Sequence, residues 1–449
     1  MKKKKAIVVI LSLIVLIVLS AGACLLIHSR YNGVYAVEGY GLCILMQNGS
    51  VKVYEVTDDY YSAEPGFDGL LLIDMLYSGL GKMKLVQTDE GLQMIDVGAQ
   101  VTYRLLRKDA LFLKDRTEVK EGMPVEAFAM FYQMYDENYA FESLYGADLT
   151  AKYEELKSRV NLKTTDAELF ERMKELVTDL KDGHVELTFG DEVFCAAEYR
   201  PEWITDNEQL SLLSGVIIGR YAKNYTKFDD CLIRYGMLSE DVGLIIIHNM
   251  GTESLDKTKS TRAAMDQIVR EFNDAGISSV VIELRFNGGG FDEASLLLAG
   301  YFTESPYLAY RKQVYCNGVF SEPQDIYVKP GKLFFDGDVY VLTSGYTISA
   351  AETFIRAMLA NPNGRVTVVG EKTAGFYSDA LERSLPGGYT YSLSNERYLS
   401  HTGEILEGKG IEPDVRIPVC VDAARAGRDD ALDYILKSTG SIAIIRREE

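Results

Sequence analysis

The stretch Val280-Val281-Ile282-Glu283-Leu284-Arg285-Phe286-Asn287-Gly288-Gly289-Gly290 decides how this chain folds. Its beginning is short, apolar and rich in β-branched residues, which is typical of a buried strand. The three glycines that follow allow the backbone to turn tightly. Another apolar stretch, over 294–298, then predicts a helix. A strand, a glycine turn and a helix in this order indicate an α/β domain.

The same alternation continues on both sides of this stretch. Short apolar runs at 242–247, 339–342 and 366–369 predict further strands. Two helices are predicted between and after them, by the apolar spacing of Met265, Ile268, Val269 and Phe272, and by that of Phe354, Ile355 and Met358. Strands that alternate with helices predict crossover units and a buried, largely parallel sheet.

The segments before this core have other periods. Leu169, Phe170, Met173, Leu176, Val177 and Leu180 recur at helical spacing, after the helix-start signal Thr165-Asp166. Asp182-Gly183 ends that helix, so His184 is expected where a helix gives way to a strand. Between residues 30 and 115, alternating apolar and polar residues surround turn signals such as Asn48-Gly49, which predicts a small antiparallel β domain without obvious chemistry.

The N-terminus predicts a membrane anchor. Lys2 to Lys5 precede an uncharged apolar run over 6–27, and a helix of that length spans about 33 Å, enough for a bilayer. The lysines place the short tail in the cytoplasm and the body outside, as in a single-pass membrane protein. The alternative is cleavage after Ala21-Gly22-Ala23, with secretion or lipid attachment at Cys24. Each version exports the body of the protein.

These patterns divide the chain into five parts. They are a cytoplasmic tail and anchor (1–28), a small β domain (29–118), a helical region carrying His184 (119–190), a core (191–425) and a C-terminal tail (426–449).

Charge and cysteine usage exclude some functions. The formal net charge is −19, and the part beyond the anchor lysines is more acidic still. Nucleic acid and anionic lipid surfaces are therefore not expected as partners, because phosphate binding needs clusters of Lys and Arg. The six cysteines contain no Cys-x-x-Cys pair, so no zinc site of cysteines is predicted. Export would permit disulfides, but the sequence does not indicate a pairing.

Three distant runs supply the parts of one hydrolytic site. They are Asp182-Gly183-His184-Val185, Thr347-Ile348-Ser349-Ala350-Ala351-Glu352, and Glu407-Gly408-Lys409-Gly410-Ile411-Glu412-Pro413-Asp414. A serine becomes a good nucleophile when a base takes its proton and a third group orients that base. Taken singly, each has a simpler explanation: Ser349 as a helix N-cap, His184 as a structural hydrogen bonder and Glu407 as a solvated charge.

From about residue 127 to residue 414, the chain resembles the C-terminal processing peptidase and tricorn core protease family of serine peptidases. The matching motifs lie at 131–141, 180–185, 283–290, 344–352, 370–375 and 407–414. The resemblance implies an α/β core of ββα spiral units like those of crotonase and Clp protease. The first 115 residues fall outside it, and the interval between Phe189 and Val242 is short for the PDZ-like module that many of these peptidases carry.

The family has two catalytic versions. In one, a lysine after a Gly-x-x-Thr-x-Gly turn is the base, and here Phe376 occupies that position while Lys372 precedes the threonine. In the tricorn-like version the base is the histidine of Asp-Gly-His, completed by a glutamate, which His184 and Glu407 match. The resemblance thus implies that Ser349 attacks the scissile carbonyl and His184 transfers the proton.

The resemblance also predicts an oxyanion hole, a substrate class and no cofactor. The N–H of Ala350 and that of Gly289 or Gly290 are expected to hold the oxyanion. The substrate is a protein or peptide, and neither a metal nor an organic cofactor is expected. The alternatives are a non-catalytic surface protein that binds ligands on the same fold, and an esterase. Neither the cleavage specificity nor the oligomeric state can be read from these residues.

Overall fold

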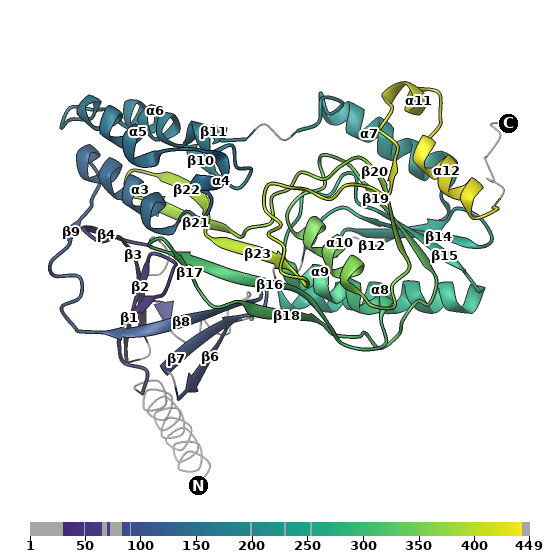
Figure 1. Ribbon diagram of the computed structural model, residues 1–449, viewed down its shortest axis with the longest axis horizontal. Coiled ribbons are helices and arrows are strands. Elements are labelled where there is room, and N and C mark those ends of the chain that lie inside the picture. Colours follow the sequence, from purple (N-terminus) through teal and green to yellow (C-terminus); the bar gives the residue numbers. More distant parts are fainter. Residues whose placement is uncertain are drawn as a thin grey trace, which may run out of the picture.

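The computed structural model describes residues 30–48, 50–64, 70–71, 83–89, 91–197, 200–228, 230–251 and 254–441. Figure 1 shows a β domain in purple and blue at the lower left, helices above it and an α/β core on the right. The mixed α/β fold predicted from the sequence is confirmed. The anchor predicted over 6–27 and the alternative cleavage site near Cys24 lie outside the described residues. In the described ranges, no helix is long and apolar enough to cross a bilayer.

The β domain is one sheet with strands in the order β6-β7-β8-β1-β2-β3-β4-β9, and β5 pairs with β3. Gln47 pairs with Ser50, so a two-residue loop joins β2 to β3 and Asn48 there has φ 52°, as the predicted Asn-Gly hairpin requires. The strands are β1 (Gly33–Val37), β2 (Leu42–Gln47), β3 (Ser50–Val56), β4 (Tyr60–Ala63), β5 (Leu70–Leu71), β6 (Met83–Thr88), β7 (Gly91–Asp96), β8 (Val101–Lys108) and β9 (Thr117–Glu118).

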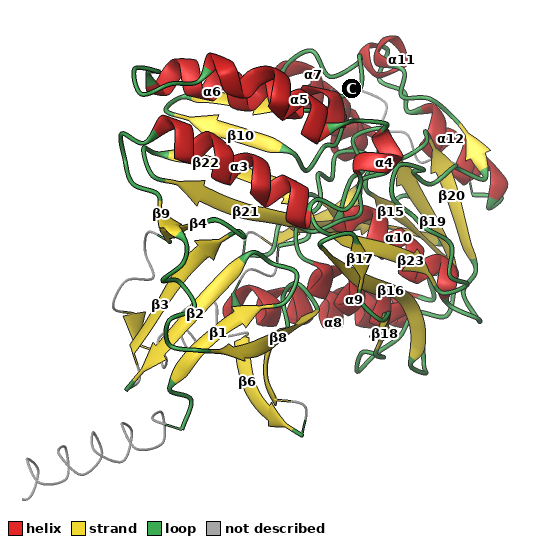
Figure 2. Ribbon diagram, turned by 60° about the vertical axis from the view of Figure 1, so that its left-hand side comes forward, coloured by secondary structure: helices red, strands yellow, loops and turns green. Residues whose placement is uncertain are grey.

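The helical region covers one face of a small sheet whose strands come from two distant parts of the chain, in the order β11-β10-β22-β21 (Figure 2). Its helices are α3 (Pro124–Asn138), α4 (Glu142–Tyr145), α5 (Leu149–Leu156) and α6 (Asp166–Val177), with short turns η1 (Lys157–Arg159) and η2 (Thr178–Leu180). The Thr165 side chain caps α6, as predicted. The sheet consists of β10 (Glu186–Phe189), β11 (Glu192–Cys195), β21 (Ala380–Leu385) and β22 (Tyr389–Ser394). Because β10 pairs with β22, strands on either side of the predicted boundary at residue 190 share one sheet.

The core is a sheet in the order β12-β13-β14-β15-β19-β20-β24, parallel from β14 onward as predicted. Its strands are β12 (Lys223–Phe228), β13 (Ile233–Met237), β14 (Val242–Ile247), β15 (Ser279–Glu283), β19 (Asp338–Thr343), β20 (Val366–Gly370) and β24 (Val415–Arg416). Apolar residues of α8 (Leu255–Ala275), α9 (Asp292–Ala299) and α10 (Ala350–Ala360) pack on one face of this sheet. The other face is covered by α7 (Asn207–Val216), η3 (Ile217–Tyr221), α11 (Val421–Arg425) and α12 (Asp430–Ser438) (Figure 1).

The predicted C-terminal tail over 426–449 differs from the structure in its first half. Helix α12 lies within it, and Leu432, Ile435 and Leu436 of that helix are buried against the core sheet. Asp429 before α12 forms an ion pair of 2.7 Å with the buried Arg285 at the end of β15. This part of the chain therefore belongs to the core.

A last group of strands connects the three parts. Strand β16 (Tyr307–Cys316) pairs with β17 (Val319–Phe320), β18 (Gln324–Val328) and β23 (Glu396–Ser400). The turn η4 (Gly300–Phe302) precedes it. Figure 1 shows β16 running from the β domain to the core. The five cysteines in the described ranges form no disulfide with one another.

Candidate active site

Topology places two of the predicted motifs side by side. Strands β15 and β19 are parallel neighbours, so their carboxyl ends meet at one edge of the core sheet. The glycine turn 288–290 follows β15, and the turn that carries Ser349 follows β19. Thr347 ties the serine turn to the end of the β15 segment, because its hydroxyl donates to the carbonyl oxygen of Leu284 at 2.9 Å.

Ser349 occupies a strained position at the N-terminus of α10. Its φ is 60° and its ψ is −125°, on the side of the backbone map that an L-residue avoids. Such conformations cost about 1–3 kcal/mol and occur where the surrounding structure enforces them, often at functional sites. The N–H of Ala350, the first residue of α10, donates to no protein group in the part of the chain that the structure describes. A hydroxyl on a strained turn, beside a free helix-start N–H, is the arrangement of a nucleophile.

Gly289 packs directly against this serine. A Cβ atom built on Gly289 would lie 2.8 Å from the Cβ of Ser349 and 3.3 Å from the backbone nitrogen of Ala350. Gly289 also has φ +96°, so both the space and the backbone conformation require glycine. The structure thus brings the glycine turn, Ser349 and Ala350 together.

The predicted oxyanion donors are not equally available. The N–H of Gly289 donates to the Asn287 side chain at 2.8 Å, so this donor is already used. Gly290 forms a β-bridge with Met250, but its own N–H takes no part in it. In that bridge the Met250 N–H donates to the Gly289 carbonyl oxygen, and the Phe291 N–H donates to the Met250 carbonyl oxygen. Within the described ranges, the Gly290 N–H donates to no protein group. The pair Gly290 and Ala350 is therefore the one free to bind an oxyanion.

One segment, residues 376–378, contacts the serine turn, His184 and Glu407. The N–H of Ser349 donates to the carbonyl oxygen of Phe376 at 3.0 Å. The ring of His184 lies 6.4 Å from the ring of Phe376, centroid to centroid. The carboxylate of Glu407 accepts the N–H groups of Tyr377 at 2.9 Å and Ser378 at 3.0 Å. All three predicted residues therefore converge on segment 376–378.

No hydrogen bond joins His184 to Ser349 or to Glu407 in the described structure. The Asp182 carboxylate holds the His184 backbone, accepting its N–H at 2.8 Å, and leaves the imidazole free. Both the Nδ1 atom of His184 and the Oε1 atom of Glu407 are buried without a partner. One is a potential donor and the other an acceptor, so the two unpaired atoms are chemically complementary.

Burial shifts the pKa of both side chains. It lowers the pKa of His184 below its ordinary 6.5, and the negative charges of Asp182, Asp379 and Asp292 oppose that shift. A neutral imidazole is the form that accepts a proton. Burial raises the pKa of Glu407 well above its ordinary value, and the Asp182 charge adds to the increase.

Glu352 belongs to the site, although no role for it was predicted from the sequence. Its carboxylate accepts the N–H of Ser349 at 3.2 Å and that of Phe376 at 3.1 Å, and it also accepts from Gly375 and from the Thr373 hydroxyl. Burial raises its pKa to about 7. The signal was the Ser-x-x-Glu spacing of Ser349 and Glu352, which is that of a capping box. Glu352 ties the serine turn to segment 376–378.

Lys312 is a second group that the sequence reasoning missed. It is 3% exposed and pairs with Glu396 at 2.8 Å, Asp379 at 3.2 Å and Asp292 at 3.4 Å. Burial would lower its pKa, but these carboxylates raise it above the ordinary value. Of its partners, Asp292 follows the glycine turn, Asp379 follows segment 376–378 and Glu396 lies on β23. Lys312 therefore fixes the two loops of the site to strand β16.

Lys372 lies apart from this network. Its side chain is 50% exposed and forms a surface ion pair of 3.0 Å with Glu412. The position that a dyad lysine would occupy holds Phe376, as the sequence shows. In the described ranges, no group of three or more His, Cys, Asp or Glu side chains is arranged to hold a metal ion.

Part of the chain matches known proteins in sequence. Residues 241–417 match the model described as "Peptidase family S41". A "Probable CtpA-like serine protease" of Staphylococcus saprophyticus is 27% identical over 177 residues, which are 39% of this chain and 34% of the relative. One from Staphylococcus aureus is 24% identical over 176 residues, 39% of this chain and 33% of the relative. The matches thus span about a third of the length of these relatives.

Solved structures share the fold. A putative peptidase from Parabacteroides merdae covers 70% of this chain and 96% of its own, with TM-score 0.60 and 22% identity. Mature CPAF covers 72% of this chain and 99% of its own, with TM-score 0.53 and 13% identity. Both extend well beyond the part matched by the family model.

Proposed function

We propose that this chain, which carries a peptidase family S41 domain over residues 241–417, is a serine endopeptidase that hydrolyses peptide bonds with Ser349, His184 and Glu407. One observation carries the proposal most strongly. Ser349 sits on a strained turn at the start of α10, packed against Gly289, and the neighbouring N–H groups of Ala350 and Gly290 donate to no protein group among the described residues. Such donors act on the charge that develops in acyl transfer.

The reaction follows from these groups. The Oγ atom of Ser349 attacks the scissile carbonyl carbon while His184 takes the hydroxyl proton. The N–H groups of Ala350 and Gly290 hold the oxyanion. His184 then gives the proton to the leaving amine, and the peptide bond breaks to leave an acyl ester on Ser349. Water, deprotonated by His184, hydrolyses that ester and restores the serine.

Glu407 is the proposed partner of the imidazole. Its unpaired Oε1 can accept a hydrogen bond from the Nδ1–H group of His184. That bond would form once segment 376–378 moves toward the imidazole. Empty sites often hold catalytic hydrogen bonds longer than those of the substrate complex. The tricorn-like version of the family supports this assignment, as does the surface position of Lys372.

Side-by-side turnover of a denatured protein substrate tests the assignment. Ser349→Ala and His184→Ala should each lose at least about 10³-fold in turnover, because members of such a unit fail together. Lys372→Ala should stay within twofold of the wild type, because the Lys372 side chain is on the surface and pairs with Glu412. Glu407→Gln should fall between. Loss of turnover in Lys372→Ala with none in His184→Ala would overturn the proposal.

We further propose that the peptidase works outside the cytoplasm, on a membrane anchor formed by residues 6–27. The four lysines and the apolar run that follows support this topology. We also propose that the core is organised as ββα spiral units. A reporter active only after export, fused behind residue 30, should be active and membrane-bound. A reporter that stays inactive would contradict export, and a soluble active one would favour cleavage.

A further inference from the structure

A cavity of about 490 Å³ lies between the β domain and the sheet of β10, β22 and β21. This volume is within the usual range of ligand pockets. The β domain contributes an apolar wall that includes Val37, Leu42 and Ile44. The opposite wall is polar and includes Thr188 of β10 and Thr390 of β22. The catalytic mechanism proposed above uses no part of this space.

Two segments that line the cavity adjoin the candidate active site. Ser392, on its polar wall, donates its hydroxyl to the carbonyl oxygen of His184 at 2.7 Å. The same hydroxyl accepts the N–H of Glu186, another lining residue, at 3.2 Å. Strand β21, which also lines the cavity, begins at Ala380, directly after segment 376–378 and Asp379. Lining residues of the cavity therefore lie next to His184 and to segment 376–378.

Strand β21 presents an unpaired edge to this space. Among the described strands it pairs only with β22. The Ser384 N–H donates to the carboxylate of Glu55 in the β domain at 2.5 Å, so it points away from β22. Backbone groups of alternate residues in a strand point the same way, so the Glu382 N–H and the Ala380 carbonyl also face the edge. These two groups are the pair that one residue of a parallel strand would bind, as Met250 does at its bridge.

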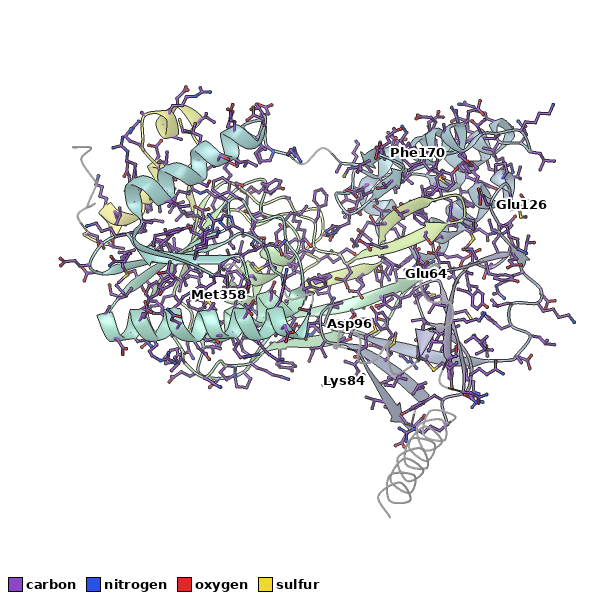
Figure 3. All side chains as sticks on the ribbon, turned by 180° about the vertical axis from the view of Figure 1, so that it is seen from behind. Glu64, Lys84, Asp96, Glu126, Phe170 and Met358 are labelled. Carbon is purple, nitrogen blue, oxygen red and sulfur yellow. The ribbon has the colours of Figure 1, made fainter. Side chains whose placement is uncertain are left out.

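The charges of the cavity select its occupant. Three carboxylates line it, those of Glu64, Glu186 and Glu382, against the single cation Arg383. The Arg383 guanidinium donates to the carbonyl oxygens of Tyr40 and Glu382 and is thus held by the protein itself. Figure 3 shows Glu64 where the β domain meets the yellow-green strands. Such a lining favours an apolar occupant with positive charge and disfavours an anionic one.

We propose that this cavity and the free edge of β21 bind an extended apolar segment of the polypeptide substrate that carries a basic residue. The proposal rests on the peptidase function and gives the β domain a role as one wall of the substrate site. Main-chain bonds to β21 supply affinity, and the apolar wall selects side chains, as in other cases of strand addition.

Binding to the inactive Ser349→Ala protein tests this without requiring turnover. The probe is a fluorescent eight-residue peptide of leucine and valine with one lysine, followed by polarisation. Thr390→Trp fills the cavity from the polar wall. Val193→Trp is the matched control, because Val193 pairs with Thr188 on the neighbouring strand, is 61% exposed and does not line the cavity. We expect about tenfold weaker binding, or 1.4 kcal/mol, for Thr390→Trp and less than a twofold change for Val193→Trp.

A second variant tests the charge without filling the space. Glu382 is exposed, so Glu382→Lys should not disturb the fold. It should weaken binding of the lysine peptide and strengthen binding of the same peptide with glutamate in place of lysine. Unchanged binding in both Thr390→Trp and Glu382→Lys would overturn the proposal. Failure of the peptidase function is seen separately, as absent labelling of Ser349 by a fluorophosphonate in the otherwise wild-type protein. Loss of peptide binding in Thr390→Trp would still support the cavity in that event.

Discussion

Replacing Gly289 by alanine should inactivate the site more than it unfolds the protein. The new Cβ would lie 2.8 Å from the Cβ of Ser349 and 2.9 Å from the carbonyl oxygen of Ile348. Overpacking of this kind costs about 1–3 kcal/mol. The positive φ of Gly289 adds about 1–2 kcal/mol for a residue with a side chain. We therefore expect the free energy of unfolding to fall by about 2–5 kcal/mol.

The loss of activity should exceed what this destabilisation explains. Part of the collision can be relieved only by moving the serine turn, and a displacement of about 1 Å at a reacting group can cost about 10²-fold in rate. The assay is the rate of Ser349 labelling by a fluorophosphonate, measured where urea unfolding shows the variant to be folded. We expect at least a hundredfold slower labelling on that basis.

Gly288→Ala is the control from the same turn. A Cβ at Gly288 would meet nothing closer than the Tyr346 hydroxyl oxygen at 3.7 Å, which is ordinary contact. This variant should keep its stability within about 0.5 kcal/mol and its labelling rate within about threefold. Equal labelling rates in Gly288→Ala and Gly289→Ala would refute the packing of Gly289 against the nucleophile.

Three further predictions concern the titratable groups of the site. Because burial lowers the pKa of His184, the labelling rate of Ser349 should reach half its maximum below pH 6.5, and a midpoint above that value would contradict a buried base. The pKa of Glu352 is about 7 in the folded protein, against an ordinary 4.5. As pH rises through that window, ionisation of Glu352 therefore lowers the free energy of unfolding, by up to about 3 kcal/mol. Urea unfolding of Glu352→Gln at pH 5 and pH 8 should show a pH dependence flatter by about that amount, and an unchanged slope would show that Glu352 does not titrate there. Lys312→Met leaves three carboxylates without their cation and should lower the unfolding free energy by about 3–5 kcal/mol, whereas a loss under about 1 kcal/mol would mean that the cluster is already neutral.

The elements that could be predicted are those set by neighbouring residues. The hairpin at Asn48, the helix start at Thr165 and the parallel strands of the core all follow from local turn chemistry or periodicity. The motif around Ser349 was placed correctly at the end of β19, because a strand followed by a capped helix is also a local pattern.

What could not be predicted depends on contacts between distant segments. Lys312 has partners from three separate segments, and no spacing in the sequence links them. Phe376 looked like the loss of a dyad lysine, whereas its backbone turned out to contact both Ser349 and Glu352. Helix α12 was missed although Leu432, Ile435 and Leu436 have helical spacing, because its short length gives a weak periodic signal.

Fluorophosphonate labelling, mapped by mass spectrometry, is the most direct test of whether Ser349 is an activated nucleophile. We expect the probe to modify Ser349, His184→Ala to slow this labelling by at least about 10³-fold, and Lys372→Ala not to slow it. A wild-type protein in which Ser349 stays unmodified, or is modified equally fast without the imidazole, would contradict this expectation.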